Sequence, residues 1–253
     1  MKSLDYEINQ LTAFSKTYSD CFDLLQMKLD KLCQFMTCKE NEMQWSLWGS
    51  HDEIKRFSEQ LRETSNQALC SMEKYQSIRA LEQKTNMSQY IANLAHSVKE
   101  ELQHYGICST SKVLFVGSGA FPLSALTIAR ETNADVLCLD IDSEAITLGK
   151  KVAEATGLQE RVQFSQNRLT ELSFMKEATH VMIASLVENK HEVLEELKHS
   201  IKADTRVMVR YGNGLKSIFN YPLEQDLSHE WEITTIIQSN NIYDTLVLQR
   251  KKN

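Results

Sequence analysis

Prolines, glycines and paired cysteines are scarce in much of this 253-residue chain. No proline and only two glycines, Gly49 and Gly106, occur in the first 110 residues. The six cysteines form no Cys-x-x-Cys pair, and no neighbouring histidine completes a zinc pattern, so the sequence predicts no bound metal. Reduced, mostly buried thiols of a cytoplasmic protein account for these cysteines without any bridge.

Long apolar runs and an excess of positive charge are also missing. No stretch comes near the roughly 18 apolar residues that a membrane-spanning helix needs, and the polar, acidic N-terminus is unlike a secretory signal. The chain has 28 Lys and Arg residues against 34 Asp and Glu residues, a net charge of −6. Non-specific nucleic-acid binding relies on the opposite balance. We therefore expect a cytoplasmic protein that binds neither membrane nor nucleic acid.

The first half of the chain contains helix-forming residues in amphipathic stripes. Apolar residues recur at spacings of three and four from Leu4 to Leu32, from Ile54 to Met72 and from Tyr90 to Leu102. Such stripes are typical of the contact faces of a helical bundle. Residues 1–108 are therefore predicted to form an all-helical N-terminal domain.

Beyond residue 108, strand patterns alternate with helical patterns. The expected strands are short apolar runs, at 112–116, 134–140, 161–164, 180–184 and 205–210, with two late strands near 231–238 and 244–250. This alternation predicts an α/β fold, a parallel doubly wound sheet that ends in an antiparallel hairpin. Residues 109–253 are thus predicted to form a Rossmann-like domain.

A glycine turn supports a nucleoside site in this second half. Gly117, Ser118 and Gly119 follow the first strand, and Asp140 ends the next strand 21 residues after Gly119. An acidic side chain there can accept hydrogen bonds from both ribose hydroxyls. Pro122 takes the place of the third glycine and removes an amide that a pyrophosphate would use. This pattern favours S-adenosylmethionine over NAD or FAD. Residues 109–253 are therefore predicted to be an S-adenosylmethionine-binding domain of the class I methyltransferase type, and a structural turn without a ligand is the alternative.

Weaker signals extend this predicted pocket to other strand ends. Ile141 lies next to Asp140, and Asn167 (or its neighbour Gln166) follows the third strand. Ser185 and Leu186 follow the fourth strand. Ligands of such sheets bind at the carboxyl ends of the strands, so these residues are candidates for contact with the nucleoside. For Ser185, an ordinary loop serine is an equal alternative.

Three segments carry a family resemblance, namely residues 116–124, 139–145 and 209–222. They resemble the nicotianamine synthases, and among them the bacterial relatives of staphylopine-like opine-metallophore pathways. The likeness covers residues 75 to 250, and the part from Lys216 to Pro222 is its most diagnostic element. The resemblance implies transfer of the 3-amino-3-carboxypropyl group of S-adenosylmethionine to the α-amino group of histidine, with D-histidine favoured and methylthioadenosine released. A partner opine dehydrogenase would then use the product.

This chemistry needs a group that accepts a proton from the attacking amine, because a free α-amino group is largely protonated at neutral pH. Glu82 is the first choice, and Glu63 and Glu73 stay open. Tyr90 lies in a segment that resembles the helix carrying a site tyrosine in the family. His96, in the same segment, is either a site residue or a core histidine.

The substrate carboxylate needs a cation, and arginine matches its geometry best. Arg210, at the end of the fifth strand, is predicted to hold it, with Lys216 as the second candidate. Phe219 and Tyr221, together with Tyr211, could form a wall for the imidazole ring or serve packing.

Two other functions remain open at this stage. The cofactor pocket alone would also fit a small-molecule methyltransferase, and a degenerate nucleotide domain would fit a helical interaction protein that is no enzyme. The sequence does not decide between a monomer and a homodimer.

Overall fold

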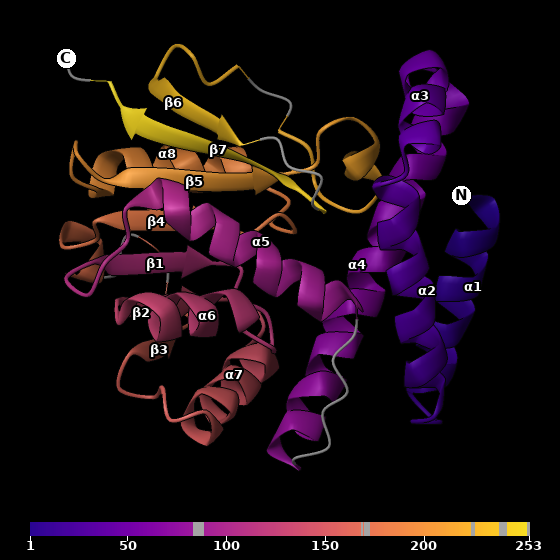
Figure 1. Cartoon of the computed structure of the whole chain (residues 1–253), viewed down its shortest axis with the longest axis horizontal. Helices are drawn as coiled ribbons and strands as arrows, with labels where there is room; N and C mark the ends of the chain where they lie inside the picture. Colours follow the sequence, from indigo (N-terminus) through magenta and orange to yellow (C-terminus); the bar gives the residue numbers. More distant parts are fainter. Residues whose placement is uncertain (83–88, 168, 170–172, 224–225, 238–241, 252–253) are drawn as a thin grey trace.

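The computed structural model describes residues 1–82, 89–167, 169, 173–223, 226–237 and 242–251, and at 89–90 and 235–237 it describes the backbone alone. Within these ranges, a seven-stranded sheet lies beside a layer of helices (Figure 1). The strands are β1 (Lys112–Val116), β2 (Asp135–Leu139), β3 (Val162–Ser165), β4 (His180–Ile183), β5 (Arg206–Tyr211), β6 (Trp231–Ile237) and β7 (Asp244–Arg250). The helices are α1 (Lys2–Ser15), α2 (Cys21–Met36), α3 (Lys39–Trp48), α4 (Asp52–Leu81), α5 (Gln89–Tyr105), α6 (Leu123–Thr132), α7 (Ser143–Ala155) and α8 (Lys190–Ser200), with short 3₁₀ helices η2 (Ser173–Lys176) and η3 (Gly214–Ile218).

The strand order is β3-β2-β1-β4-β5-β7-β6, with β1 to β5 parallel and the β6–β7 hairpin antiparallel at one edge. This confirms the predicted α/β fold with helices in front of it. The chain leaves β1 toward β2 on one side and enters β4 on the other, so the strand order reverses between β1 and β4. Ligands of open α/β sheets bind at such a reversal, beyond the carboxyl ends of the strands.

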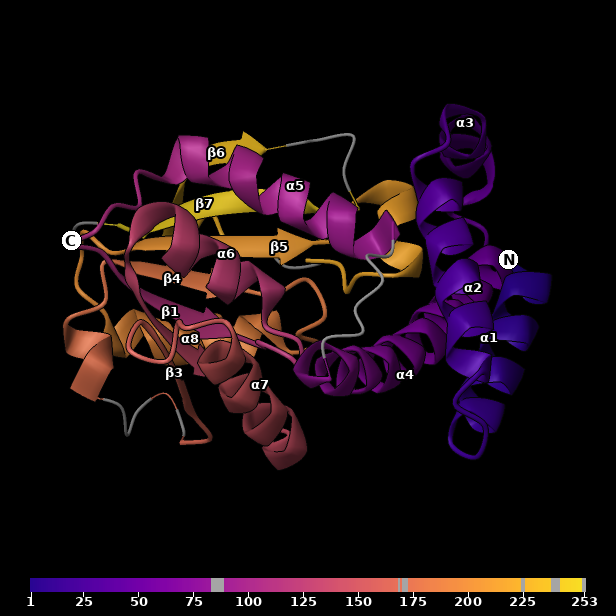
Figure 2. The ribbon, with the colours of Figure 1, turned by 60° about the horizontal axis from the view of Figure 1, so that its bottom comes forward.

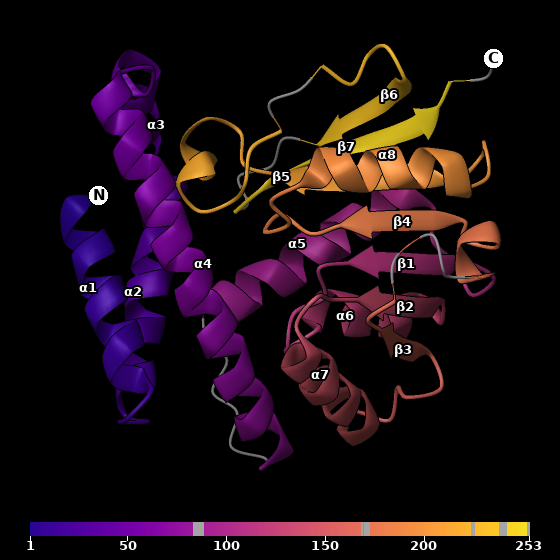
Figure 3. The ribbon, with the colours of Figure 1, turned by 180° about the vertical axis from the view of Figure 1, so that it is seen from behind.

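Alternate side chains of each strand build two separate cores. Val113 and Phe115 of β1 pack with α5, α6 and α7, whereas Leu114 faces the opposite way and packs with α8. Figure 3 shows α8 in front of that second face. A strand covered on both faces has to be apolar throughout, which explains why β1 reads as a continuous apolar run.

Helix α5 covers the sheet although it lies within the segment 1–108. Its buried residues Val98 and Tyr105 share a core cluster with Phe115 of β1 and Ala125 of α6. By packing, α5 therefore belongs mainly with the sheet. The domain boundary at residue 108 stays a prediction.

Helix α4 connects the two layers. Its 30 residues span about 45 Å at 1.5 Å per residue. One end packs against α1, α2 and η3, and the other lies against α7, as Figure 2 shows. Leu61, Leu69 and Met72 bury one stripe of α4 in the helical layer. Another stripe of α4, which is not buried in the helical layer, therefore faces the carboxyl ends of the strands.

Candidate active site

The glycine turn after β1 has a backbone that only glycine adopts readily. Gly117 and Gly119 have φ angles of +79° and +68°. A Cβ on Gly117 would come within 2.6 Å of Val187 Cγ2, and a Cβ on Gly119 would overlap the carboxylate of Glu73. Both glycines are thus required by conformation and by close approach, and Gly119 brings the turn against α4.

Asp140 holds this turn from the end of β2. Its Oδ2 accepts a hydrogen bond from the Gly119 N–H at 2.8 Å, and its Oδ1 accepts one from the Asp142 N–H at 3.0 Å. Each carboxylate oxygen keeps a further lone pair for a ligand. The next side chain, Ile141, is fully exposed. An acid beside an exposed apolar side chain fits a ribose and the flat face of a base, so these residues fit the predicted nucleoside.

The other predicted contacts of the nucleoside lie around the same edge. Pro122 directly precedes α6, where its missing N–H costs no helical hydrogen bond. Ser118 is buried within the turn, and Asn167 is exposed just beyond β3. No ligand contact of any of these residues is tested by the geometry, so their roles stay predictions.

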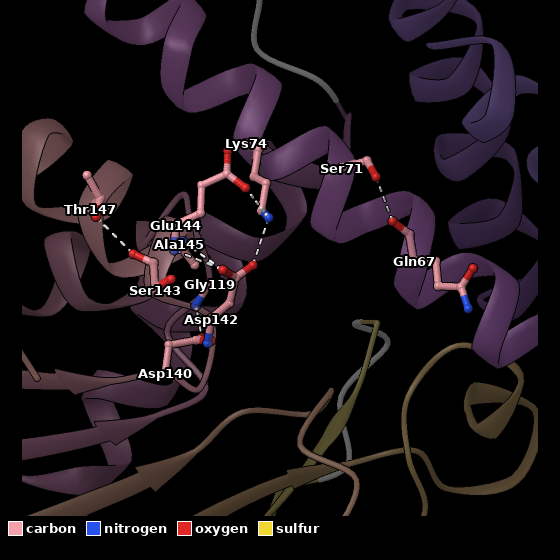
Figure 4. Close-up of polar contacts among 10 residues, drawn as sticks. All are labelled: Gln67, Ser71, Lys74, Gly119, Asp140, Asp142, Ser143, Glu144, Ala145 and Thr147. Carbon is pink, nitrogen blue, oxygen red and sulfur yellow. Dashed lines mark hydrogen bonds and ion pairs between the residues drawn. The ribbon is translucent and has the colours of Figure 1, made fainter. Parts of the chain in front are cut away.

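Lys74 ties α4 to the start of α7. Its Nζ lies 2.7 Å from Asp142 Oδ2 and 2.6 Å from Glu144 Oε2. Asp142 also caps α7 by accepting hydrogen bonds from the backbone N–H groups of Glu144 and Ala145. Figure 4 shows this cluster beside Asp140 and Gly119. The glycine turn, the end of β2 and α4 are therefore held together by charged contacts.

Glu73 is the acidic residue that α4 brings to the glycine turn. Burial, together with the nearby charge of Asp140, raises the pKa of Glu73 to about 8, while a hydrogen bond from the Ala120 backbone opposes the rise. A carboxyl group with a pKa near neutrality in such a place is a candidate acid or base. Sequence reasoning had left Glu73 open and had preferred Glu82, which follows α4 at its exposed end.

A stripe of α4 residues continues from Glu73 in both directions, at spacings of three and four. One turn on, Ser77 Oγ donates a hydrogen bond to the Ala120 carbonyl at 2.7 Å. One turn back lies Cys70, and burial and the charges of Glu73 and Asp140 raise the pKa of its thiol to about 11. Asn66 and Arg62 extend the stripe toward the loop after β5. The spacing places these residues on one face of α4, but it does not by itself distinguish Glu73 from the other acids of the segment.

The loops after β4 and β5 meet at a buried lysine. Lys190 Nζ donates to the backbone carbonyls of Ser185 (2.9 Å), Val187 (2.5 Å) and Tyr221 (3.3 Å). The Tyr221 N–H also donates to the Ser185 carbonyl at 3.1 Å. Burial and the charge of Arg62 lower the pKa of Lys190 to about 7. Lys190, which the sequence analysis did not single out, thus joins two loops at the carboxyl edge of the sheet.

Two basic side chains lie close to the ring of Tyr221. The Arg62 guanidinium carbon is 5.1 Å from the centre of its ring, and Lys190 Nζ is 5.6 Å away. Its hydroxyl donates to both carboxylate oxygens of Glu63 at 2.9 Å. Burial and this contact raise the pKa of Tyr221 to about 12. Tyr221 therefore belongs to the edge of the candidate site, although its predicted role as a wall for an imidazole is untested.

Arg210 has a different partner from the predicted one. Its guanidinium is buried and donates to Glu101 of α5 through Nε (3.2 Å) and Nη2 (2.5 Å) and to Ser124 Oγ at 2.9 Å. Thr245 completes the network by donating to Glu101 at 2.7 Å. Because this fork is already engaged, the structure corrects the predicted carboxylate contact of Arg210 to a structural ion pair in the core.

Other predicted substrate residues also have internal partners. Lys216 Nζ lies 2.5 Å from Asp244 Oδ1, and Phe219 is buried in the cluster of the N-terminal helices, against which Leu186 also packs. His96 is largely exposed on α5, with Nε2 3.3 Å from Glu100 Oε1. The side chain of Tyr90 lies outside the described residues.

Neither a metal-binding cluster nor a helix suited to crossing a membrane occurs among the described residues. In these ranges, no group of three or more His, Cys, Asp and Glu side chains is placed to hold a metal ion. None of the helices in the described part of the chain is both long and apolar enough to cross a membrane.

Comparison with known proteins places the whole chain in one family. The family model "Nicotianamine synthase protein" matches residues 1–253. The L-histidine 2-aminobutanoyltransferase of Pseudomonas aeruginosa (strain UCBPP-PA14) is 37% identical over 250 residues, which cover 99% of this chain and 95% of that protein. The protein of the same name from Yersinia pestis is 33% identical over 254 residues, covering 98% and 94%.

Solved structures show the same fold. MtNAS in complex with MTA and tNA aligns with a TM-score of 0.81 at 14% identity, covering 99% of this chain and 98% of that chain. At such identity the likeness concerns the fold alone, whereas the full-length match to the family model carries the assignment and confirms the resemblance. This chain belongs to the nicotianamine synthase family.

Proposed function

We propose that this protein transfers the 3-amino-3-carboxypropyl group of S-adenosylmethionine to the α-amino group of histidine and releases methylthioadenosine. The observation that carries the proposal is the position of Glu73, a carboxyl group with a raised pKa held against the glycine turn of a nucleoside site. Family membership and the names of the bacterial relatives support the donor and the acceptor.

The reaction is a displacement at the carbon of the 3-amino-3-carboxypropyl group that is bonded to the sulfonium sulfur. The amine nitrogen of the acceptor forms the new bond to that carbon, and the carbon–sulfur bond breaks with its electron pair going to sulfur. The neutral thioether, methylthioadenosine, leaves. The nitrogen must lose a proton, and Glu73 in its ionised form would accept it. The rest of the rate acceleration comes from holding the acceptor amine in line with the donor carbon that it attacks.

The glycine-turn side of the site, namely Gly117, Gly119, Asp140, Ile141 and Glu73, would hold the donor. Asp140 would accept hydrogen bonds from the ribose, and the exposed Ile141 would pack on the adenine. Acidic groups also suit a sulfonium cation. Several carboxylates lie near this turn, and Lys74 offsets two of them, Asp142 and Glu144.

Product analysis tests the proposal. The protein is incubated with S-adenosylmethionine and either L-histidine or D-histidine, and the released nucleoside is identified by mass spectrometry. Methylthioadenosine is the expected nucleoside, and S-adenosylhomocysteine in its place would show a methyltransferase. The predicted preference for D-histidine stays a prediction. The relatives carry L-histidine in their names, so both enantiomers are offered separately.

Some finer expectations rest on the family resemblance. The product keeps a secondary amine and a free primary amine, so a dehydrogenase could condense it reductively with an α-keto acid to give an opine metallophore. We also keep the homodimer and the cytoplasmic location as predictions. Light scattering of the purified protein and fractionation of the producing cells would test them.

A further inference from the structure

Unpartnered polar atoms gather on α4 beside Tyr221, away from the glycine turn. We propose that Arg62 and Asn66 form the subsite that binds the carboxylate of the amino-acid acceptor. This inference rests on the proposed transfer function and names the residues that would recognise its second substrate. It replaces Arg210, whose guanidinium is engaged by Glu101.

Arg62 is held in place with part of its guanidinium unused. Its Nη1 donates to the Ser217 carbonyl at 2.8 Å, and its guanidinium lies over the Tyr221 ring. Its Nε is buried and has no hydrogen-bond partner among the described residues. The carboxylate of Glu63 lies 4.0 Å from Nε, beyond hydrogen-bond distance, and is taken by the Tyr221 hydroxyl. A buried donor on a cation costs free energy unless a ligand completes it.

Asn66 lies one helical turn further along the same stripe. Both its Nδ2 and its Oδ1 are buried without a hydrogen-bond partner in the described part of the chain. Its amide lies near enough to the Tyr221 hydroxyl to oppose the rise in the pKa of that group. Because Nδ2 carries two N–H donors, Asn66 can offer one to a carboxylate oxygen beside its contact with Tyr221, and its Oδ1 can accept from an N–H of the same ligand.

The charges along α4 fit an amino-acid zwitterion in one orientation. Arg62 carries the fixed positive charge of the Tyr221 side (Arg62, Asn66, Ser185, Lys190 and Tyr221), with Glu63 4.0 Å from its Nε, whereas Asp140, and Glu73 once it is ionised, make the glycine-turn side negative. The Cα atoms of Asn66 and Glu73 are separated by seven residues, about 10 Å along the helix axis. An acceptor between them would point its amine at Glu73 and its carboxylate at Arg62 and Asn66.

The test combines acceptor analogues with variants. Histamine is histidine without the carboxylate. Wild-type protein, Arg62→Met and Asn66→Asp are each assayed for methylthioadenosine release with histidine and with histamine. Arg56→Met changes an exposed arginine of the same helix and serves as the matched control. The KM for S-adenosylmethionine is measured in parallel.

We expect wild-type and Arg56→Met proteins to prefer histidine over histamine by about ten- to a hundredfold in kcat/KM, the range expected for a hydrogen bond to a charged group. In Arg62→Met, this preference should collapse toward one while the KM for S-adenosylmethionine stays within about twofold. Asn66→Asp keeps the shape but repels a carboxylate, so it should lower kcat/KM for histidine and spare histamine. Asn66→Asp also gives the answer if Arg62→Met does not fold.

Two outcomes overturn the subsite. One is an unchanged preference for histidine in the folded variants, and the other is a raised KM for S-adenosylmethionine with the acceptor KM unchanged. Failure of the proposed function looks different, because wild-type protein would then release no methylthioadenosine with histidine at all.

Discussion

The two sides of the site are built in different ways. The glycine-turn side is shaped largely by backbone, namely two left-handed glycines and the capped start of α7, and apart from Glu73 its residues lie between Gly117 and Ile141. The Tyr221 side consists of side chains from α4 and from the loops after β4 and β5, which lie far apart in the sequence. We predict that the first side binds the donor, as strand ends do in other nucleoside-binding α/β folds, and that the second side binds the acceptor. Variants on the two sides should therefore separate donor binding from acceptor use.

The largest effect is expected at Glu73, where the two sides meet. Glu73→Gln should lower the transfer rate by about a hundredfold to ten-thousandfold, because the acceptor amine loses its base. The affinity for S-adenosylmethionine, measured by calorimetry, should change far less. The pH profile of wild-type kcat/KM should rise near pH 8, where Glu73 ionises, and Glu73→Gln should lack that limb. Glu59→Gln, an exposed acid on the same helix, is the control. If Glu73→Gln and Glu59→Gln lowered the transfer rate equally, Glu73 would not be the base.

Replacing Arg210 should lower the stability of the fold without changing the binding of either substrate. Arg210→Met leaves Glu101 buried without its cation, so unfolding free energy should fall by about 3–5 kcal/mol. Denaturant titration measures this loss. Protein that stays folded should keep its KM for both substrates. A normal stability with a raised acceptor KM would instead restore the carboxylate contact predicted from the sequence.

Asp140 should affect donor binding only. Asp140→Ala removes a charged hydrogen-bond acceptor whose loss is worth about 1.5–3 kcal/mol in total, so the Kd for S-adenosylmethionine should rise about ten- to a hundredfold. Asp140→Asn keeps the shape and should lose less. If calorimetry finds the Kd within about twofold of wild type, Asp140 does not contact the donor.

Lys74 should have the smallest effect. It is partly exposed in a cluster with Asp142 and Glu144, and ion pairs of this kind contribute at most about 1 kcal/mol. Lys74→Met should lower the free energy of unfolding by at most about 1 kcal/mol. It should change the Kd for S-adenosylmethionine by less than about fivefold, and raised salt should reduce both differences. A much larger loss of donor affinity would mean that the ion pairs of Lys74 with Asp142 and Glu144 position Glu73 against the glycine turn.

Local signals made the glycine-turn side predictable from the sequence. The first expected strand coincides with β1, and the turn and Asp140 occur where the motif required them, because backbone conformation and strand ends leave short-range patterns. Family membership was also predictable, since three segments of the second half carry it.

Contacts set by tertiary packing were not predictable in the same way. Glu73 meets Gly119 only because the helical layer fixes the rotation of α4, and no local pattern separates Glu73 from Glu63 or Glu82. Arg210 was predicted to face the ligand from its place near a strand end. It shares a face of β5 with Met208, the face that α5 covers, and there it meets Glu101. The sequence of a strand does not indicate which of its two faces a helix from another segment will cover.

The most direct measurement of the central claim follows the carbon that moves. Wild-type protein is given histidine with S-adenosylmethionine labelled with carbon-13 either in the methyl group or in the aminocarboxypropyl chain, and the products are read by NMR. The chain label should appear bonded to the histidine nitrogen, and the methyl label should stay in methylthioadenosine. A methyl label on histidine, with the chain label retained in S-adenosylhomocysteine, would contradict the account.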